Sequence, residues 1–85
     1  MDTWIERRKQ RRETVEIEAT VVHDAGLARW SATILDITKL GAMLELAADT
    51  ALPPTFHLLF AHTIQPCQTV WAKGRYVGVS FLRQL

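Results

Sequence analysis

The sequence predicts an all-β domain, a small antiparallel β-barrel of six or seven strands. Short segments of alternating apolar and polar residues recur at intervals of about 8–12 residues, with turn residues between them. No segment shows the 3.6-residue apolar period of an amphipathic helix. The chain has 85 residues, of which 48% are hydrophobic, so it forms one domain with a small core. Closure into a barrel is expected because it protects the strand edges of so small a domain.

Three strands are expected in the first half of the domain. Residues 14–22 alternate, and their apolar members point to one side: Val15, Ile17, Ala19 and Val21. Residues 23–26 form a turn in which Gly26 can take a positive φ. A second strand over residues 29–37 leads through a short step into a third strand over residues 42–46.

Three further strands are expected after a loop over residues 47–55, where Pro53 and Pro54 interrupt the sheet because proline lacks the N–H of a central strand. The fourth strand covers residues 56–60, and the fifth begins after Pro66 and runs from about residue 67 to residue 72. A tight turn at Lys73-Gly74 leads into a sixth strand over residues 75–82.

Particular residues carry further expectations for the barrel. Gly78 permits a bulge or a close backbone approach in the sixth strand. Trp30 and Trp71 are expected in the core. The chain ends at Leu85, soon after the last strand, so we expect little or no C-terminal helix.

Positive charge is concentrated in one short segment. Five of the six residues from 7 to 12 are basic, although the formal net charge of the chain is only +1: Arg7, Arg8, Lys9, Arg11 and Arg12. We therefore divide the chain into a flexible basic arm, residues 1–12, and a barrel domain, residues 13–85. Arginine grips phosphate with two parallel hydrogen bonds and stacks on aromatic rings, so the arm indicates a site for an anionic, planar ligand. A solvated basic tail is the alternative.

The arm contains the first of two motifs that are separated in the sequence. The first is Arg8-x-x-x-Arg12, directly preceded by Arg7, and the second is Asp36-Ile37-Thr38-Lys39-Leu40-Gly41. Together they resemble the RxxxR and (D/N)xSxxG motifs of the PilZ family of bacterial cyclic di-GMP receptors, over nearly the whole chain. Thr38 stands where the family usually has serine, so the hydroxyl is kept and a methyl group is added.

The resemblance implies a stand-alone receptor module in second-messenger signalling, not an enzyme. It implies that Arg8 and Arg12 contact guanine and phosphate, that Asp36 and Thr38 contact a guanine edge, and that Gly41 shapes the turn. Arg7 at its position implies capture of two stacked cyclic di-GMP molecules. Cyclic di-GMP is then the ligand, an unidentified downstream protein is the partner, and no cofactor is expected.

Other functions receive less support from the sequence. The His residues and Cys67 lack the spacing of a metal site, and no catalytic motif is present, so neither metal ligands nor catalytic residues are expected. A lone cysteine, no signal-peptide pattern and no apolar run of about 20 residues favour a cytoplasmic protein without membrane insertion. A barrel that binds single-stranded nucleic acid is an alternative, disfavoured by a pI near 8. The other alternative is a PilZ-like interaction module without nucleotide binding.

Overall fold

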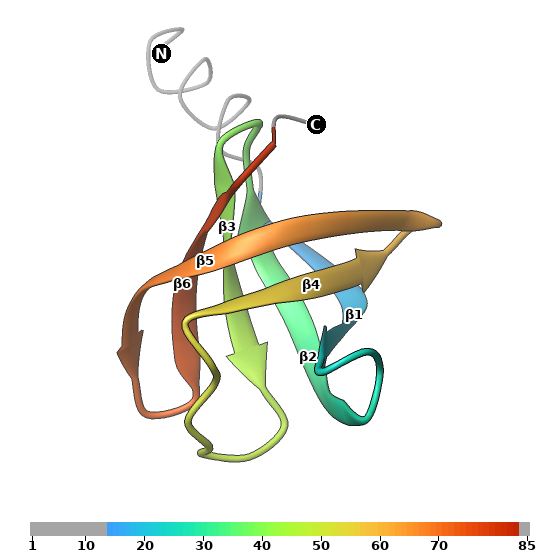
Figure 1. Cartoon of the computed structure of the whole chain (residues 1–85). Coiled ribbons are helices and arrows are strands. Elements are labelled where there is room, and N and C mark those ends of the chain that lie inside the picture. Colours follow the sequence, from blue (N-terminus) through green and yellow to red (C-terminus); the bar gives the residue numbers. More distant parts are fainter. Residues whose placement is uncertain (1–13, 84–85) are drawn as a thin grey trace, which may run out of the picture.

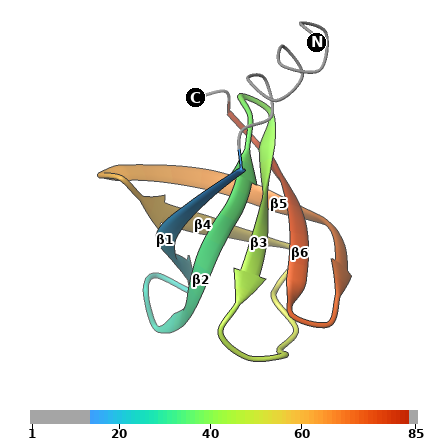
Figure 2. The same ribbon diagram turned by 180° about the vertical axis from the view of Figure 1, so that it is seen from behind.

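The computed structural model describes residues 14–83, which form a closed six-stranded antiparallel β-barrel (Figure 1). The strands are β1 (Thr14–His23), β2 (Ala28–Ile37), β3 (Gly41–Leu46), β4 (Thr55–Phe60), β5 (Thr63–Lys73) and β6 (Tyr76–Phe81). Their order around the barrel is β1-β2-β3-β6-β5-β4, and Figure 2 shows β1, β2, β3 and β6 side by side. The predicted fold class is confirmed, with six strands. No part of residues 14–83 is helical, so this region contains no helix that could span a membrane.

The core is built from the inward-facing residues of alternating strands. Ile34, Leu44 and Leu58 are fully buried, and each comes from a different strand. Trp30 packs against this cluster, as expected. Cys67 also lies inside, where burial raises the pKa of its thiol to about 12 and keeps it neutral.

The β4–β5 connection differs from the prediction. Ala61 and His62 form a two-residue turn in which both residues have positive φ, 49° and 61°. Such turns usually contain glycine or asparagine, and neither residue is present here to indicate the turn. As a result β5 begins at Thr63, and the predicted start after Pro66 is wrong.

Pro66 is tolerated inside β5 because of where its backbone points. Its carbonyl oxygen accepts a hydrogen bond from the Leu82 N–H at 2.9 Å, one residue beyond the end of β6. In an extended strand, the N and the C=O of one residue point to the same side. The missing proline N–H therefore faces the end of the β5–β6 ladder and not β4, so the β4–β5 ladder, in which Pro66 lies opposite His57, loses no hydrogen bond.

Bulges change the side-chain alternation at two places that matter for the site. Leu35 is an extra residue in β2, because Ile34 pairs with Leu44 while Asp36 pairs with the adjacent residue of β3. Val70 is extra in β5 in the same way, between Thr69 and Trp71. Since side chains alternate with a period of two, one extra residue moves the next side chain to the opposite face.

The bulge at Val70 decides where Trp71 lies. Inward alternation from Cys67 through Thr69 would have placed Trp71 in the core, as we expected. Trp71 is instead 44% exposed on the outer face of the barrel. The predicted core position of Trp71 is therefore wrong, and the extra residue is the physical reason.

Candidate functional site

A single line of directly opposite residues crosses four strands on the outer face of the barrel. From β2 to β5 the line consists of Asp36, Met43, Gly78 and Trp71, and Thr14 of β1 pairs with Asp36. Residues directly opposite each other in an antiparallel pair share a face. That face is the outer one, because Leu44 and Val77, which follow Met43 in β3 and precede Gly78 in β6, are buried in the core.

Both ends of this line depend on a bulge. Asp36 follows the extra residue Leu35, and Trp71 follows the extra residue Val70. Without these bulges, both side chains would continue the inward alternation of their strands. The two bulges therefore bring a carboxylate and an indole onto the same outer surface, three strand spacings or about 14 Å apart.

The turn between β2 and β3 is closed by the hydroxyl group of Thr38. The Thr38 N–H donates to the Gly41 carbonyl at 2.8 Å. Thr38 Oγ1 in turn accepts from the Leu40 N–H at 3.1 Å and the Gly41 N–H at 3.3 Å. Threonine supplies these bonds as well as serine does, so the departure from the family motif leaves the turn intact.

Residue 41 has to be a glycine because there is no room for a side chain, and not because of its backbone conformation. It begins β3 directly opposite Ser80 in β6. A Cβ at this position would overlap the carbonyl oxygen of Val79, which is backbone and cannot rotate away. Its φ is not positive. Of the two reasons that favour glycine here, the close approach of two backbones is the one that applies.

A shallow hollow of about 420 Å³ joins the motif to the aromatic side chain. Its lining includes Asp36, Thr38, Gly41, Met43 and Trp71. We call this surface the motif hollow. Trp71 was absent from the predicted site, although a signal for it exists in the sequence. Counting back from the tight turn around Gly74 places Trp71 opposite Gly78, so the hairpin carries an aromatic residue against a glycine.

The three arginines predicted to bind ligand lie outside the described residues. Thr14, which begins β1, lies directly opposite Asp36 of the second motif, and Arg12 is two residues before Thr14 in the sequence.

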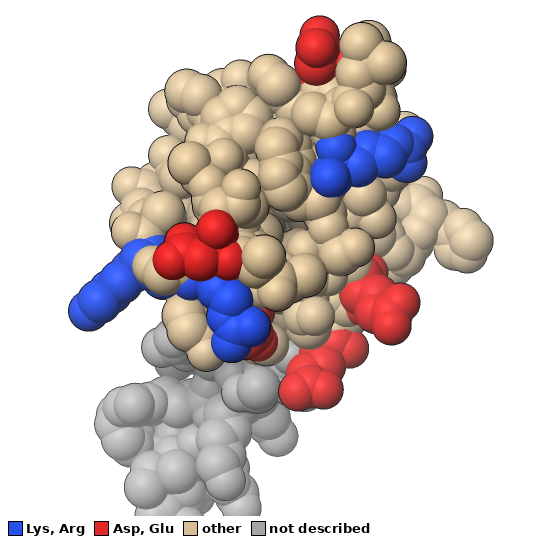
Figure 3. Space-filling view, turned by 90° about the horizontal axis from the view of Figure 1, so that it is seen from below, with Lys and Arg blue, Asp and Glu red and all other residues tan. Residues whose placement is uncertain are grey.

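The barrel itself offers no concentration of positive charge. Residues 14–85 contain five Lys or Arg and six Asp or Glu, a net charge of −1, whereas residues 1–13 contain five and three, a net charge of +2. Figure 3 shows basic and acidic side chains interspersed on the face that it displays. The excess positive charge of the chain therefore belongs to the N-terminal residues.

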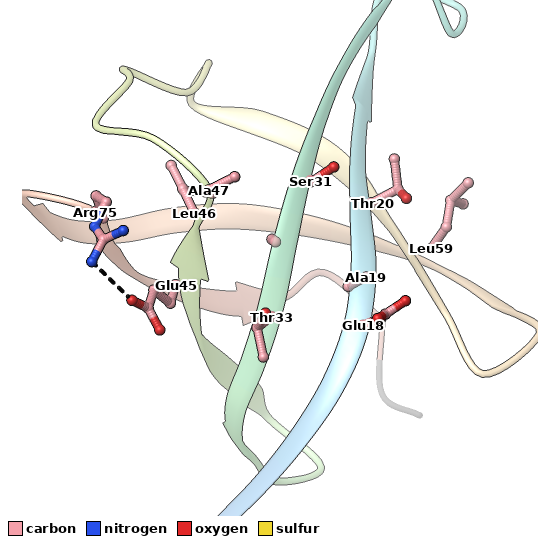
Figure 4. Close-up of a pocket in the computed structure, with 11 residues that line it drawn as sticks. Glu18, Ala19, Thr20, Ser31, Thr33, Glu45, Leu46, Ala47, Leu59 and Arg75 are labelled. Carbon is pink, nitrogen blue, oxygen red and sulfur yellow. Dashed lines mark ion pairs between the residues drawn. The ribbon is translucent and has the colours of Figure 1, made fainter.

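A second, larger hollow lies on the outer face of β1, β2 and β3 (Figure 4). Its volume is about 640 Å³, and its lining is mainly small or polar, including Thr20, Ser31 and Thr33. Glu18 and Glu45 line it as well, and Glu45 Oε2 lies 3.2 Å from Nη2 of Arg75. We call it the polar hollow. Asp36, Thr38 and Gly41, the predicted site residues within the described part of the chain, do not line it.

Comparison with known proteins identifies the family. A search of curated proteins gave no match. The family model of the PilZ domain, in contrast, matches residues 6–85, a range that contains both motifs and all six strands. PilZ domains are binding modules for cyclic di-GMP rather than enzymes. A match over almost the whole length, on a closed antiparallel barrel with the second motif at the β2–β3 turn, shows that this chain belongs to the PilZ domain family.

Proposed function

We propose that this protein is a cyclic di-GMP receptor that binds its ligand between the N-terminal arginines and the motif hollow. The observation that carries the proposal is the pairing of Thr14 with Asp36. This pairing joins the strand that follows the RxxxR segment to the strand that carries the DxTxxG turn. Thr14, two residues after Arg12 in the sequence, therefore lies beside Asp36 in the sheet, although 23 residues separate Arg12 from Asp36 along the chain.

The arginines and the carboxylate divide the recognition of a guanine nucleotide between them. Arg8 and Arg12 can donate paired hydrogen bonds to guanine O6 and N7 and charge-assisted bonds to phosphate. Asp36 is an acceptor when ionised, so it can accept from the guanine N1–H and N2–H₂ groups or orient an arginine. Its position on the outer face, set by the bulge at Leu35, turns it toward the motif hollow.

Trp71 adds an aromatic surface to this set. Its indole is 44% exposed and lines the same hollow as Asp36 and Thr38. An exposed tryptophan in the same hollow as an acceptor suited to guanine offers a face on which a base can stack. We therefore include Trp71 among the ligand-binding residues.

Thr38 and Gly41 act mainly by shaping the turn. The Thr38 hydroxyl accepts two backbone hydrogen bonds within the turn and donates a long one, 3.5 Å, to the Gly41 carbonyl; because it is exposed, it can exchange this long bond for one to a guanine edge. Gly41 lets β3 lie close against β6 at the border of the hollow.

The receptor acts by presenting a new surface when the ligand is bound. Bound nucleotide would hold the arginine-bearing segment against the outer face of the barrel, and a downstream protein would recognise the combined surface. We place this event in the bacterial cytoplasm, in keeping with the neutral, buried thiol of Cys67. No catalytic step is part of the proposal.

Isothermal titration calorimetry of the full chain with cyclic di-GMP tests the proposal. We expect saturable binding whose affinity falls only modestly between 50 and 200 mM salt, because few phosphates are neutralised. A titration with a single-stranded oligonucleotide tests the alternative function. The affinity for such a ligand would fall steeply with rising salt. No heat with cyclic di-GMP, or tighter binding of the oligonucleotide, would refute the receptor function.

A further inference from the structure

Residue 78 of β6 is a glycine because the indole of Trp71 occupies the space that a larger side chain would need. A Cβ built on Gly78 would overlap Nε1, Cδ1 and Cε2 of Trp71, which all belong to the pyrrole ring. The φ of Gly78 is not positive, so its backbone conformation is open to any residue. Glycine is thus required here by the space that the indole occupies, and not by the strand.

The neighbours of Gly78 show what this bare position achieves. In the register of the sheet, Gly78 lies between Met43 of β3 and Trp71 of β5. Both of those side chains line the motif hollow. Because no side chain stands between them, the pyrrole ring of Trp71 rests on β6 and leans toward the strand that begins at the DxTxxG turn.

We propose that Gly78 is a positioning residue for ligand binding, which seats the indole of Trp71 against β6 at the border of the motif hollow. The inference rests on the proposed function, because the position of the indole matters through a base stacked on it. The bulge at Val70 turns Trp71 outward, and the bare backbone at Gly78 then sets how the ring lies. A ring held in its binding position before the ligand arrives loses less conformational freedom on binding.

The position of the ring can be tested without ligand. In the full chain labelled with 5-fluorotryptophan, substitution Trp71→Phe assigns one ¹⁹F resonance to Trp71. We expect Gly78→Ala to shift this resonance while those of Trp4 and Trp30 stay in place. Gly74→Ala is the matched control: it adds the same methyl group to the same hairpin, where nothing lies within 4 Å, and it should leave the Trp71 resonance unchanged.

Titration with cyclic di-GMP then tests the consequence. Trp71→Ala and Gly78→Ala should each weaken binding by about tenfold, within the range expected for loss of one base–aromatic stack. Adding Gly78→Ala to Trp71→Ala should cause no further loss, because both act through the same ring. Gly74→Ala should bind within about twofold of the unmodified protein, although its positive φ of 61° makes alanine destabilising there.

Several outcomes would overturn the inference. An unshifted Trp71 resonance or unchanged affinity in Gly78→Ala would do so, and so would additive losses in the double variant. Should Gly78→Ala alone not fold, the double variant with Trp71→Ala has to fold and bind as Trp71→Ala does, because the overlap is gone. If the unmodified protein does not bind cyclic di-GMP, the proposed function fails, while the ligand-free spectra still decide whether Gly78 positions the ring.

Discussion

The motif hollow and the polar hollow lie on the same sheet and differ in almost every chemical respect. The polar hollow is the larger, about 640 Å³ against about 420 Å³ for the motif hollow. One line of opposite residues crosses it, Glu18–Thr33–Glu45, and here each strand keeps its regular alternation. The motif hollow lies where two strands lose that alternation at Leu35 and Val70.

This difference shows that size is a poor guide to the binding site of this protein. Glu18 and Glu45 disfavour an anion in the polar hollow, and Arg75, which pairs with Glu45, offsets only one of the two charges. The motif hollow has one carboxylate, suited to guanine donors, and adjoins the strand that continues from the arginines. Departures from local regularity, rather than volume, mark the functional surface.

The largest expected effect is the loss of ligand binding when an N-terminal arginine is replaced, in contrast to replacement of an arginine elsewhere in the chain. Arg8→Ala or Arg12→Ala should abolish measurable cyclic di-GMP binding while the barrel stays folded. Each lost charge-assisted contact costs about 1.5–3 kcal/mol, and each arginine should make more than one. Calorimetry gives the affinity, and circular dichroism checks the fold.

Arg75→Ala provides the matched control for this comparison. It removes one guanidinium from the polar hollow, where Arg75 contacts Glu45, and binding should stay within about twofold of the unmodified protein. Near-normal titration curves for both Arg8→Ala and Arg12→Ala would contradict the assignment. Loss of binding in Arg75→Ala would move the site toward the polar hollow.

A smaller effect is expected inside the motif hollow, between Asp36 and Thr38. Asp36→Ala should weaken binding by roughly 10- to 100-fold, because a carboxylate that accepts two guanine donors contributes more than one neutral contact. Thr38→Ala should weaken it less and also lower thermal stability, since the turn loses the acceptor for Leu40 and Gly41.

Thr38→Ser is the control for this pair. It keeps the hydroxyl that closes the turn and removes only the methyl group, so binding should be unchanged or slightly tighter. Titrations of the three variants at one salt concentration give the ranking. If Thr38→Ala were more damaging than Asp36→Ala, the role of Asp36 at the guanine edge would be wrong.

The number of bound nucleotides depends on Arg7. A stacked pair of cyclic di-GMP molecules brings four phosphates together, and a third guanidinium can neutralise and stack on them. We expect two nucleotides per chain, falling toward one in Arg7→Ala with much of the affinity kept. Calorimetric stoichiometry at saturation measures this directly. A value of one for the unmodified protein would leave Arg7 without a role in binding.

Much of the barrel could be predicted from the sequence because its strands follow simple alternation. Residues 14–22 and 29–37 were placed almost as the structure has them, and their inward positions Val21 and Ile34 are fully buried. The errors come from local backbone choices. A turn with positive φ at Ala61 and His62 carries no glycine, and the Pro66 carbonyl bond to Leu82 depends on where β6 ends.

Individual residues of the site could be predicted from the sequence, but the surface that they form could not. Asp36, Thr38 and Gly41 were found through a motif, and the structure brings them into one hollow. Trp71 was expected in the core, which is also where regular alternation from Cys67 would place it. A bulge adds one residue without a distinctive sequence, so only the pairing Trp71–Gly78 shows that the strand has changed face.

The smallest expected effect lies in the ion pair of the polar hollow. Arg75 and Glu45 have side chains 49% and 30% exposed, and exposed pairs of this kind contribute roughly 0–1 kcal/mol to stability. Glu45→Gln should therefore lower the free energy of unfolding by less than about 1 kcal/mol, measured by urea denaturation. Glu18→Gln removes an exposed carboxylate and should leave stability unchanged within about 0.5 kcal/mol. Both variants remove a negative charge, so both should bind cyclic di-GMP slightly more tightly at low salt, by less than about twofold, and this gain should disappear as salt screens it. A marked loss of nucleotide binding in either variant would show that the polar hollow takes part in recognition, and the contrast between the two hollows would no longer hold.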